Sequence, residues 1–549
     1  MRLKRLMQPR LDEPLPLWMI FPVVFAALYA THFTLLRLPY YWDEAGYYIP
    51  AAWDFFRTGS LIPISTLSNA HPPLPSIYLA LWWKASGFYP EVTREAVLMV
   101  ASLGLLAVWR LAMRLVGVAS VAFWTVLLTG LYPVWFAQST LAHADIFAAA
   151  CTLWGLVFSI PDRGRKPGRE LWAAAVWFAA AALCKETAIF IPLTLAVVCA
   201  VEAVCASGPL RFRLLRETAW LASCVFPLAA WYSYHYAKTG FLFGNPEFLR
   251  YNAQANLDPL RILAAFGHRI LHLTAHMNMF VPVLMACAAL MLAPRLGADG
   301  HERAGIARAG IPEESLRRIL LLLLMNAAIF SVLGGALLTR YLLPMYPLVL
   351  LLAVTAFYRR VPFWPLMAAF SAAAFAVGLF INPPYGFAPE DNLAYAHVIR
   401  LHQAAIAQLA KRYPGASVLT AWPMSDELTR PELGYVKQPW DVCPIDDFSS
   451  AQIDRAADEP EKFSAALVFS TKYDPPRPLL TLGAKSAELD EKYFGLHHDL
   501  PPEEIARRLG GELVWEKLDD GQWVALIRFE RVLSAERNTV GQPDPDANR

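Results

Sequence analysis

An acidic pair, Asp43–Glu44, lies in the aromatic run from Tyr40 to Tyr48, directly after the first long apolar stretch of the chain. His71 follows in the same stretch between apolar runs, before two prolines. Aromatic side chains gather at the level of lipid headgroups, so a carboxylate among them is suited to chemistry on a lipid-linked substrate. We therefore take Asp43 as a candidate general base. The alternative is that Asp43 caps a helix over residues 45–56.

Composition fixes the class of protein. The chain has 549 residues, of which 56% are hydrophobic and only 17% charged, and its mean hydropathy is +0.36. These values predict a polytopic membrane protein. A net charge of +2 and the lack of a basic tail with interleaved aromatic residues argue against a nucleic-acid partner. Of the seven cysteines only Cys443 lies outside the apolar runs, which argues against a disulfide framework.

Apolar runs of about 20 residues predict about eleven transmembrane helices. The first is longer than the apolar core of a signal peptide, so we interpret it as a retained helix. The predicted spans cover residues 17–37, 97–116, 118–137, 140–160, 171–184, 187–206, 218–237, 274–293, 318–338, 341–358 and 361–381.

The distribution of basic residues predicts the orientation. With a cytoplasmic N-terminus, the inner segments hold roughly twice as many Lys and Arg residues as the outer loops, which is the bias expected of cytoplasmic segments. Two large loops, 38–96 and 238–273, then face outward, as does everything after residue 381. We expect a bacterial inner-membrane protein with this side in the periplasm.

From residue 382 the sequence becomes richer in charge and proline, and no run is long enough to span a bilayer. The patterns predict an extracytoplasmic α/β domain over 382–537, a disordered tail over 538–549, and a membrane domain over 1–381. The expected elements are helices at 394–412 and 502–509, strands at 417–421 and 465–470, and a hairpin of 512–516 with 523–529.

Three further charged residues fall at the outer ends of apolar runs. Asp145 lies inside an otherwise apolar helix, where a charge costs several kcal/mol unless it is paired or hydrated. It either positions an acceptor, shares a metal with Asp43, or pairs with Lys185. Lys185 and Arg340 are cations suited to a lipid phosphate. Their alternatives are an ion pair of Lys185 with the adjacent Glu186, and extension of Arg340 to lipid headgroups.

The remaining polar candidates each have two interpretations. His71 hydrogen-bonds substrate or Asp43, or else it caps a turn. Tyr341 contributes to substrate binding or anchors the chain at the membrane interface. His268, His272 and His276 share one helical face, which suits a divalent metal or a plain interfacial helix. We leave this trio out of the site, and the metal requirement stays open.

The order of these motifs resembles the membrane glycosyltransferases of the C superfamily, near the protein O-mannosyltransferases and the aminoarabinose transferases of lipid A. The arginine that precedes the fourth-helix acid in the mannosyltransferases is absent, with Thr140 and Leu141 in its neighbourhood. The resemblance implies the C-type transferase fold and an essential role for Asp43. It rests on Asp43-Glu44, His71-Pro72-Pro73-Leu74, Asp145 and Arg340-Tyr341-Leu342-Leu343-Pro344.

The sequence therefore predicts an integral-membrane glycosyltransferase that moves a sugar from a polyprenyl-phosphate donor to a protein, lipid or glycan. The expected catalytic residues are Asp43, Glu44 and Asp145, and the expected substrate-binding residues are His71, Lys185, Arg340 and Tyr341. No loop of the G-x-x-x-x-G-K type is present, which favours a lipid-linked donor over a nucleotide sugar. The main alternative is a secondary transporter with Asp145, Lys185 and Arg340 as ligands, and another is a membrane anchor for a sensing domain.

Overall fold

The chain divides into two compact units. The first contains residues up to Leu36 together with Ala51–Ile381, and the second contains Arg37–Pro50 together with the chain from Asn382 onward. This structure is a computed structural model that describes residues 16–161, 170–244, 246, 257–296, 307–333, 335–476, 478, 492–494 and 499–529. The predicted tail at 538–549 and the basic residues before residue 11 lie outside the described residues.

The first unit is built of helices. Helix α2 (Ile49–Thr58) contains the division between the units. The other helices are α1 (Leu17–His32), η2 (Phe33–Leu35), α3 (Leu74–Ser86), α4 (Pro90–Leu115), α5 (Ala119–Leu131), α6 (Pro133–Gln138), α7 (Ala144–Ser159), α8 (Leu171–Cys184), η4 (Glu186–Ile189), α9 (Phe190–Cys205), α10 (Gly208–Ala222), α11 (Val225–Thr239), α13 (Pro259–Thr274), η6 (His276–Asn278), α14 (Phe280–Leu290), α15 (Glu313–Val332), η7 (Thr339–Leu342), α16 (Tyr346–Arg360) and α17 (Trp364–Phe380).

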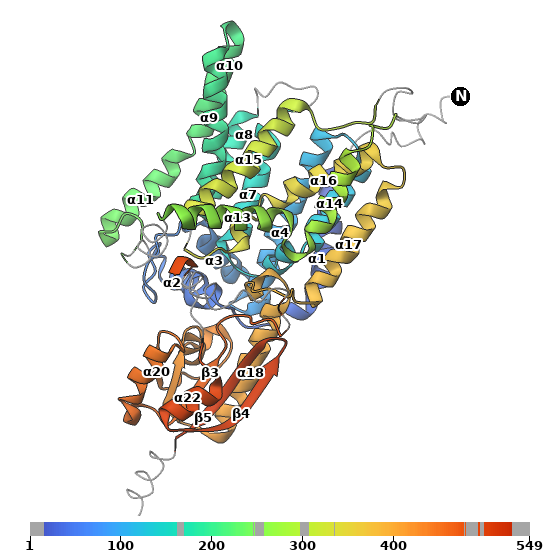
Figure 1. Ribbon diagram of the computed structural model, residues 1–549. Helices are drawn as coiled ribbons and strands as arrows, with labels where there is room; N and C mark the ends of the chain where they lie inside the picture. The colour runs from blue at the N-terminus through green and yellow to red at the C-terminus, as the bar shows by residue number, and fades with distance from the viewer. Residues whose placement is uncertain are drawn as a thin grey trace, which may run out of the picture. The chain divides into compact units, whose positions relative to one another are not determined.

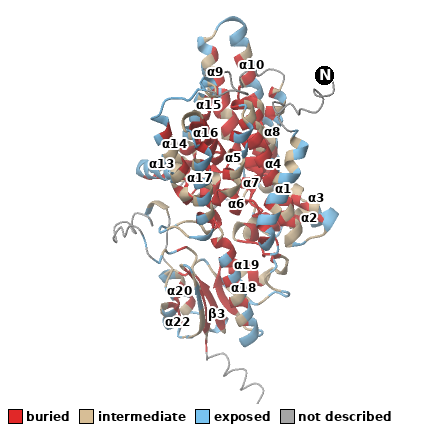
Figure 2. Cartoon of the chain, turned by 90° about the vertical axis from the view of Figure 1, so that its right-hand side faces the viewer, coloured by how far each residue is buried: buried red, intermediate tan, exposed pale blue. Residues whose placement is uncertain are grey.

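Helix α4 lies at the centre of this unit. It contacts α1, α5 and α7, and α7 in turn packs along α8. Figure 2 shows that buried residues gather on α4, α5, α7 and α16. In Figure 1, α9 and α10 run side by side as a hairpin. A helix that is apolar on all sides is either buried or faces lipid, which fits the exposed apolar residues of the outer helices, such as Val201 and Phe370.

Within the described ranges, four helical stretches are long and apolar enough to cross a membrane: Leu17–Leu35, Pro90–Leu115, Glu186–Cys205 and Glu313–Val332. A fifth candidate is a helix pair, Pro259–Asn278 with Phe280–Leu290, which is bent by 101°. Shorter apolar helices are Ala119–Leu131, Ala144–Ser159, Leu171–Cys184 and Trp364–Phe380. Each predicted span contains helix, whereas the number of membrane crossings stays a prediction.

Several predicted bounds require correction. The segment 218–237 is not one helix, because α10 ends at Ala222 and α11 begins at Val225. Pro227 explains the interruption, since proline lacks an N–H and clashes with the preceding helical turn. Helix α4 begins at Pro90 rather than at 97, with proline and then Glu91 in its first turn, which are favourable at a helix start.

The two segments predicted as outer loops contain helices. Arg94, expected in the first outer loop, lies inside α4, where it is buried and donates from Nη1 to the carbonyl of Thr140 at 2.7 Å. The second loop contains α13, whose N-cap Asp258 accepts hydrogen bonds from the backbone N–H groups of Leu260 and Arg261.

The second unit contains a five-stranded sheet in the order β2-β1-β3-β5-β4. Strand β1 pairs in parallel with β2 and β3, whereas β5 is antiparallel to β3 and β4. Strands β1 and β3 are fully buried, as expected of parallel strands covered on both faces. The elements are η3 (Glu44–Tyr48), η8 (Pro389–Asp391), α18 (Ala394–Arg412), β1 (Val418–Ala421), α19 (Met424–Thr429), η9 (Pro431–Leu433), β2 (Val442–Ile445), α20 (Ser450–Ala457), η10 (Pro460–Lys462), β3 (Ala465–Phe469), α22 (Pro502–Leu509), β4 (Glu512–Asp519) and β5 (Gln522–Arg528).

The elements predicted for this region are all present. Helix α18 has the predicted bounds, and the hairpin turns at Asp520 and Gly521, which both have positive φ, as a tight hairpin requires. Strand β2 and helices α19 and α20 were not predicted. They are short, and β2 is a partly exposed edge strand interrupted by Pro444, so its apolar signal is weak.

Candidate functional site

Asp145 lies in the first turn of α7, after the extended residue His143. Backbone N–H groups at a helix N-terminus stabilise a carboxylate there. The side chain is 3% exposed, so its charge requires compensation from neighbouring groups. Two cations provide it.

The first cation is Lys185. Helix α8 ends at Cys184 and η4 begins at Glu186, which leaves Lys185 in extended backbone between two helices. Its Nζ atom lies 2.6 Å from Oδ1 of Asp145. The adjacent Glu186 contacts His71 instead, with 3.0 Å between Oε2 and Nδ1. Lys185 therefore pairs with Asp145 and not with its neighbour in sequence.

The second cation is Arg340, in the short helix η7. Its Nε atom lies 3.4 Å from Oδ2 of Asp145, and its side chain is 3% exposed. This burial contradicts the alternative that Arg340 extends to lipid headgroups. Tyr341 stacks on Phe330 with ring centroids 5.6 Å apart, and Nζ of Lys185 lies 4.2 Å from the centre of the Tyr341 ring. Tyr341 thus belongs to the cation cluster, in contrast to the alternative of a membrane-interface anchor.

Two buried arginines of α13 were missed in the sequence. Arg269 donates from Nη1 to the carbonyl of Leu338 at 2.7 Å, and its guanidinium carbon lies 5.6 Å from the centre of the Tyr341 ring. Arg261 donates to the carbonyls of Ser331 and Gly335, each at 3.2 Å. Both arginines therefore bind the backbone that leads into η7. The available signal was their spacing of eight residues on one face of an amphipathic helix.

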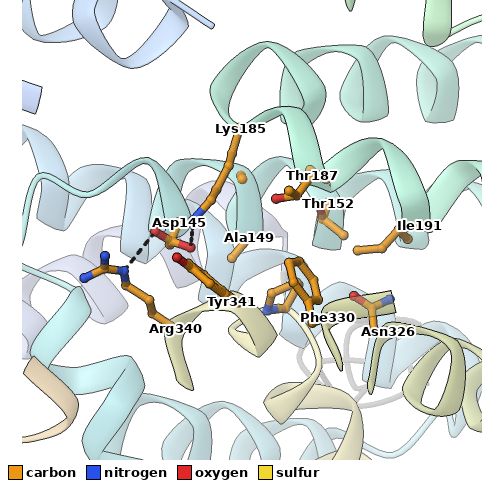
Figure 3. A pocket seen from close by; sticks show the side chains of 13 residues that line it. Asp145, Ala149, Thr152, Lys185, Thr187, Ile191, Asn326, Phe330, Arg340 and Tyr341 are labelled. Atoms are coloured by element: carbon orange, nitrogen blue, oxygen red, sulfur yellow. Dashed lines mark hydrogen bonds and ion pairs between the residues drawn. The ribbon is translucent and has the colours of Figure 1, made fainter. Parts of the chain in front are cut away.

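The cluster lines a pocket (Figure 3). Figure 3 shows Asp145 between Lys185 and Arg340, with Tyr341 beside them. The pocket is partly open, and its cavity volume is about 20 Å³. Its other walls combine small and apolar side chains with a few polar ones, and the hydroxyl of Thr152 is buried without a hydrogen-bond partner within the described ranges. The remaining lining residues are Ala148, Ala149, Thr187, Ala188, Ile191, Asn326, Phe330 and Pro344.

Chemically, this pocket carries two cations whose charge one carboxylate of the protein partly neutralises. Two buried cations with different geometries, one forked and one a point charge, suit a phosphate group. Small and apolar walls suit a group that is less polar than the phosphate itself.

Asp43 and Glu44 lie in the second unit and have different environments. Glu44 is fully buried and its Oε2 accepts a hydrogen bond from the backbone N–H of Tyr41 at 2.9 Å. Asp43 is only half-buried and stands at the N-cap position of η3 without a side-chain capping hydrogen bond. The alternative that Asp43 caps this helix is therefore wrong, and Glu44 instead closes the turn.

The backbone around Asp43 is irregular. Trp42 has a φ of 47°, which is rare for a residue other than glycine, and η3 is a π-helical turn. Such irregularities persist where the surroundings impose them and are frequent at functional sites. This observation singles out the acidic pair independently of its sequence motif.

The three histidines of the α13 region form a row rather than a cluster. The ring centroid of His272 lies 6.2 Å from that of His268 and 5.4 Å from that of His276. Helix α13 ends at Thr274, and Met277 and Asn278 have positive φ, so the helical face does not continue through His276. In the parts of the chain that the structure describes, no group of three or more His, Cys, Asp or Glu side chains is arranged to hold a metal ion.

The protein matches known proteins in structure and not in sequence. No protein-family model matches the sequence, and no curated protein matches it significantly. Among solved structures, ArnT from Cupriavidus metallidurans in the apo state matches with a TM-score of 0.52 at 15% identity. The same protein bound to undecaprenyl phosphate matches with a TM-score of 0.54 at 16% identity. Each comparison covers 92% of this chain and 97% of the other.

The chain has an ArnT-like fold. At these identities the likeness is one of fold, and it extends over both units because nearly the whole of each chain is aligned. It confirms the coarser part of the predicted fold class, a mostly helical chain with several apolar helices and a small C-terminal sheet.

Proposed function

We propose that this protein is an integral-membrane glycosyltransferase that takes its sugar from a polyprenyl-phosphate donor. The observation that carries the proposal is the buried cluster of Asp145, Lys185 and Arg340 on the wall of a pocket. The fold adds support, because the structural neighbour ArnT has been solved bound to undecaprenyl phosphate.

In the proposed reaction, the acceptor hydroxyl attacks the anomeric carbon of the donor and inverts it. The bond from that carbon to the phosphate oxygen breaks, and the electron pair leaves with the phosphate. Lys185 and Arg340 stabilise the charge on the departing phosphate. Asp43 accepts the proton of the acceptor hydroxyl.

The other residues have supporting roles in this proposal. The carboxylate of Asp145 holds Lys185 and Arg340 in place. Glu44, through its hydrogen bond to Tyr41, shapes the turn that presents Asp43. His71 reaches the site through Glu186, the neighbour of Lys185. The acceptor is a protein, lipid or glycan on the outer side of the inner membrane.

Donor binding provides the first test. Arg340→Ala should weaken binding of a polyprenyl-phosphate sugar by purified protein, and Arg340→Lys should recover only part of it because the forked contact is lost. A matched control is Arg317→Ala, since the Arg317 side chain is 64% exposed on α15 and pairs with Glu202 away from the pocket. Equal donor binding by Arg340→Ala and Arg317→Ala would contradict the phosphate assignment.

Catalysis provides the second test. Asp43→Asn preserves size but removes the basic carboxylate, so donor binding should persist while transfer of a radiolabelled sugar falls by about 10²-fold or more. Near-wild-type transfer at matched protein level and thermal stability would exclude Asp43 as the base.

The transporter alternative can be tested with the same purified protein. The 101° bend between Pro259–Asn278 and Phe280–Leu290 is a feature that broken transporter helices also have. Reconstituted protein that accumulates a solute along an ion gradient, and transfers no sugar, would favour that alternative with Asp145, Lys185 and Arg340 as its ligands.

A further inference from the structure

Residues Arg37–Pro50 belong to the same compact unit as the C-terminal domain, although more than three hundred residues separate them in the sequence. The backbone of Tyr40 makes two hydrogen bonds to this domain. Its N–H donates to the carbonyl of Leu433 at 3.2 Å, and its carbonyl accepts from the hydroxyl of Tyr435 at 3.0 Å. The ring of Tyr41 packs on that of Tyr395, with centroids 5.9 Å apart. Direct contacts with the domain therefore hold the acidic segment.

Trp422 contacts residues on both sides of the acidic pair. It follows directly after β1, at the carboxyl end of a parallel strand, where α/β sheets commonly present functional residues. Its ring meets that of Trp42 edge to face, with centroids 5.0 Å apart. A Cβ atom added to Gly46 would lie 2.8 Å from Cζ2 of the same ring. One indole thus contacts the residue before Asp43 and a residue one turn after it.

The contact matters because the turn around Asp43 is strained. Trp42 has a φ of 47°, and the N–H of Gly46 donates to the carbonyl of Trp42 at 2.9 Å across the turn. A conformation of this kind persists only when packing imposes it. The indole of Trp422 supplies such packing on both sides of the turn, and only glycine at position 46 leaves room for it.

We propose that Trp422 is a positioning residue for Asp43, so that the C-terminal domain sets the geometry of the catalytic base through Trp42 and Gly46. This inference rests on the proposed function, in which Asp43 accepts the proton of the acceptor. It gives the C-terminal domain a task in the chemical step itself.

The test uses the full-length protein in liposomes with a radiolabelled polyprenyl-phosphate sugar. Trp422→Ala should lower kcat by about 10²-fold, the loss typical of a misplacement of about 1 Å, while the KM for the donor and the binding of polyprenyl phosphate stay at the wild-type value. Trp422→Phe keeps an aromatic ring and should recover most of kcat. The matched control is Trp515→Ala, a half-buried tryptophan of β4 at the far edge of the same sheet. It should retain kcat even where thermal stability falls.

A compensating pair keeps the proposal testable if Trp422→Ala fails to fold. Gly46→Ala should lower kcat, because its new methyl group meets the indole, and Trp422→Phe in the same chain should restore part of the loss by making room. Additive losses in the double variant would overturn the proposal, as would equal kcat in Trp422→Ala and Trp515→Ala. These outcomes are separable from failure of the proposed function, which shows as no sugar transfer by the wild-type protein. They are also separable from failure of the base assignment, which shows as full turnover in Asp43→Asn.

Discussion

Replacing Asp145 by asparagine removes the negative charge that two buried cations share. The distances to the carboxylate oxygens are 2.6 Å for Lys185 and 3.4 Å for Arg340. At an effective dielectric constant of about 20, these separations correspond to gross attractions of about 6 and about 5 kcal/mol. Desolvation offsets much of this, and breaking a buried pair typically costs about 3–5 kcal/mol because an uncompensated charge stays behind. We expect Asp145→Asn to lose about that much stability.

Thermal unfolding of the purified protein in detergent measures the effect. The control is Glu459→Gln, which breaks the ion pair with Lys462 at the same distance of 2.6 Å but with side chains 55% and 52% exposed. Exposed pairs contribute about 0–1 kcal/mol, so this control should change the midpoint little. Equal shifts for Asp145→Asn and Glu459→Gln would refute the argument that burial gives the Asp145 cluster its stability.

Two additions connect this prediction to function. The double variant Asp145→Asn, Lys185→Met also removes one of the two cations. It should be more stable than Asp145→Asn alone, because fewer like charges stay buried together. Polyprenyl phosphate should raise the midpoint of Asp145→Asn more than that of the wild type, since its phosphate supplies the missing negative charge. A ligand effect no larger in the variant would indicate that the phosphate does not reach these cations.

Three further outcomes are expected. Single cysteines at Ile64 and Lys437 in a cysteine-free background should both react with an impermeant reagent added from the periplasmic side, and labelling from opposite sides would overturn the predicted topology. Gly155→Ala should cost about 1–3 kcal/mol, because its Cβ would lie 2.5 Å from Cε1 of Phe178, and Phe178→Leu should restore part of the thermal stability. Burial raises the pKa of the Asp426 carboxyl above its ordinary value of 3.8, so its charged form lowers stability at neutral pH. Asp426→Asn should therefore raise the midpoint at pH 7, and this gain should shrink as the pH falls through the pKa of Asp426; a gain that does not change with pH would contradict it.

Much of the fold could be predicted from the sequence because it depends on local patterns. Runs of apolar residues indicated the helices of the first unit, and period-3.6 and period-2 patterns indicated α18 and the β4–β5 hairpin. The bounds failed where proline acts locally, at Pro90 and Pro227. Those errors have local causes and could have been avoided.

The arrangement of the site could be predicted only in part. The residue types, and their predicted position on one side of the membrane, indicated Asp145, Lys185 and Arg340. The choice of partner for Lys185, in contrast, depends on how α7, α8 and η4 pack. Arg269 could be recognised only by its place on an amphipathic helix, because its partners are backbone carbonyls that any sequence provides. The grouping of Asp43 with the C-terminal domain had no sequence signal, since it depends on contacts between distant segments.

The hydrogen bond between Tyr435 and Tyr40 joins residues 395 positions apart. A ribosome working at about 5–20 residues per second synthesises the second partner roughly 20–80 s after the first. During that interval the acidic segment has left the ribosome without the surface that shapes it. The proposed base is thus among the first residues to be made and among the last to reach its final conformation, so a chain shortened before Tyr435 would retain its membrane helices and lack an ordered Asp43.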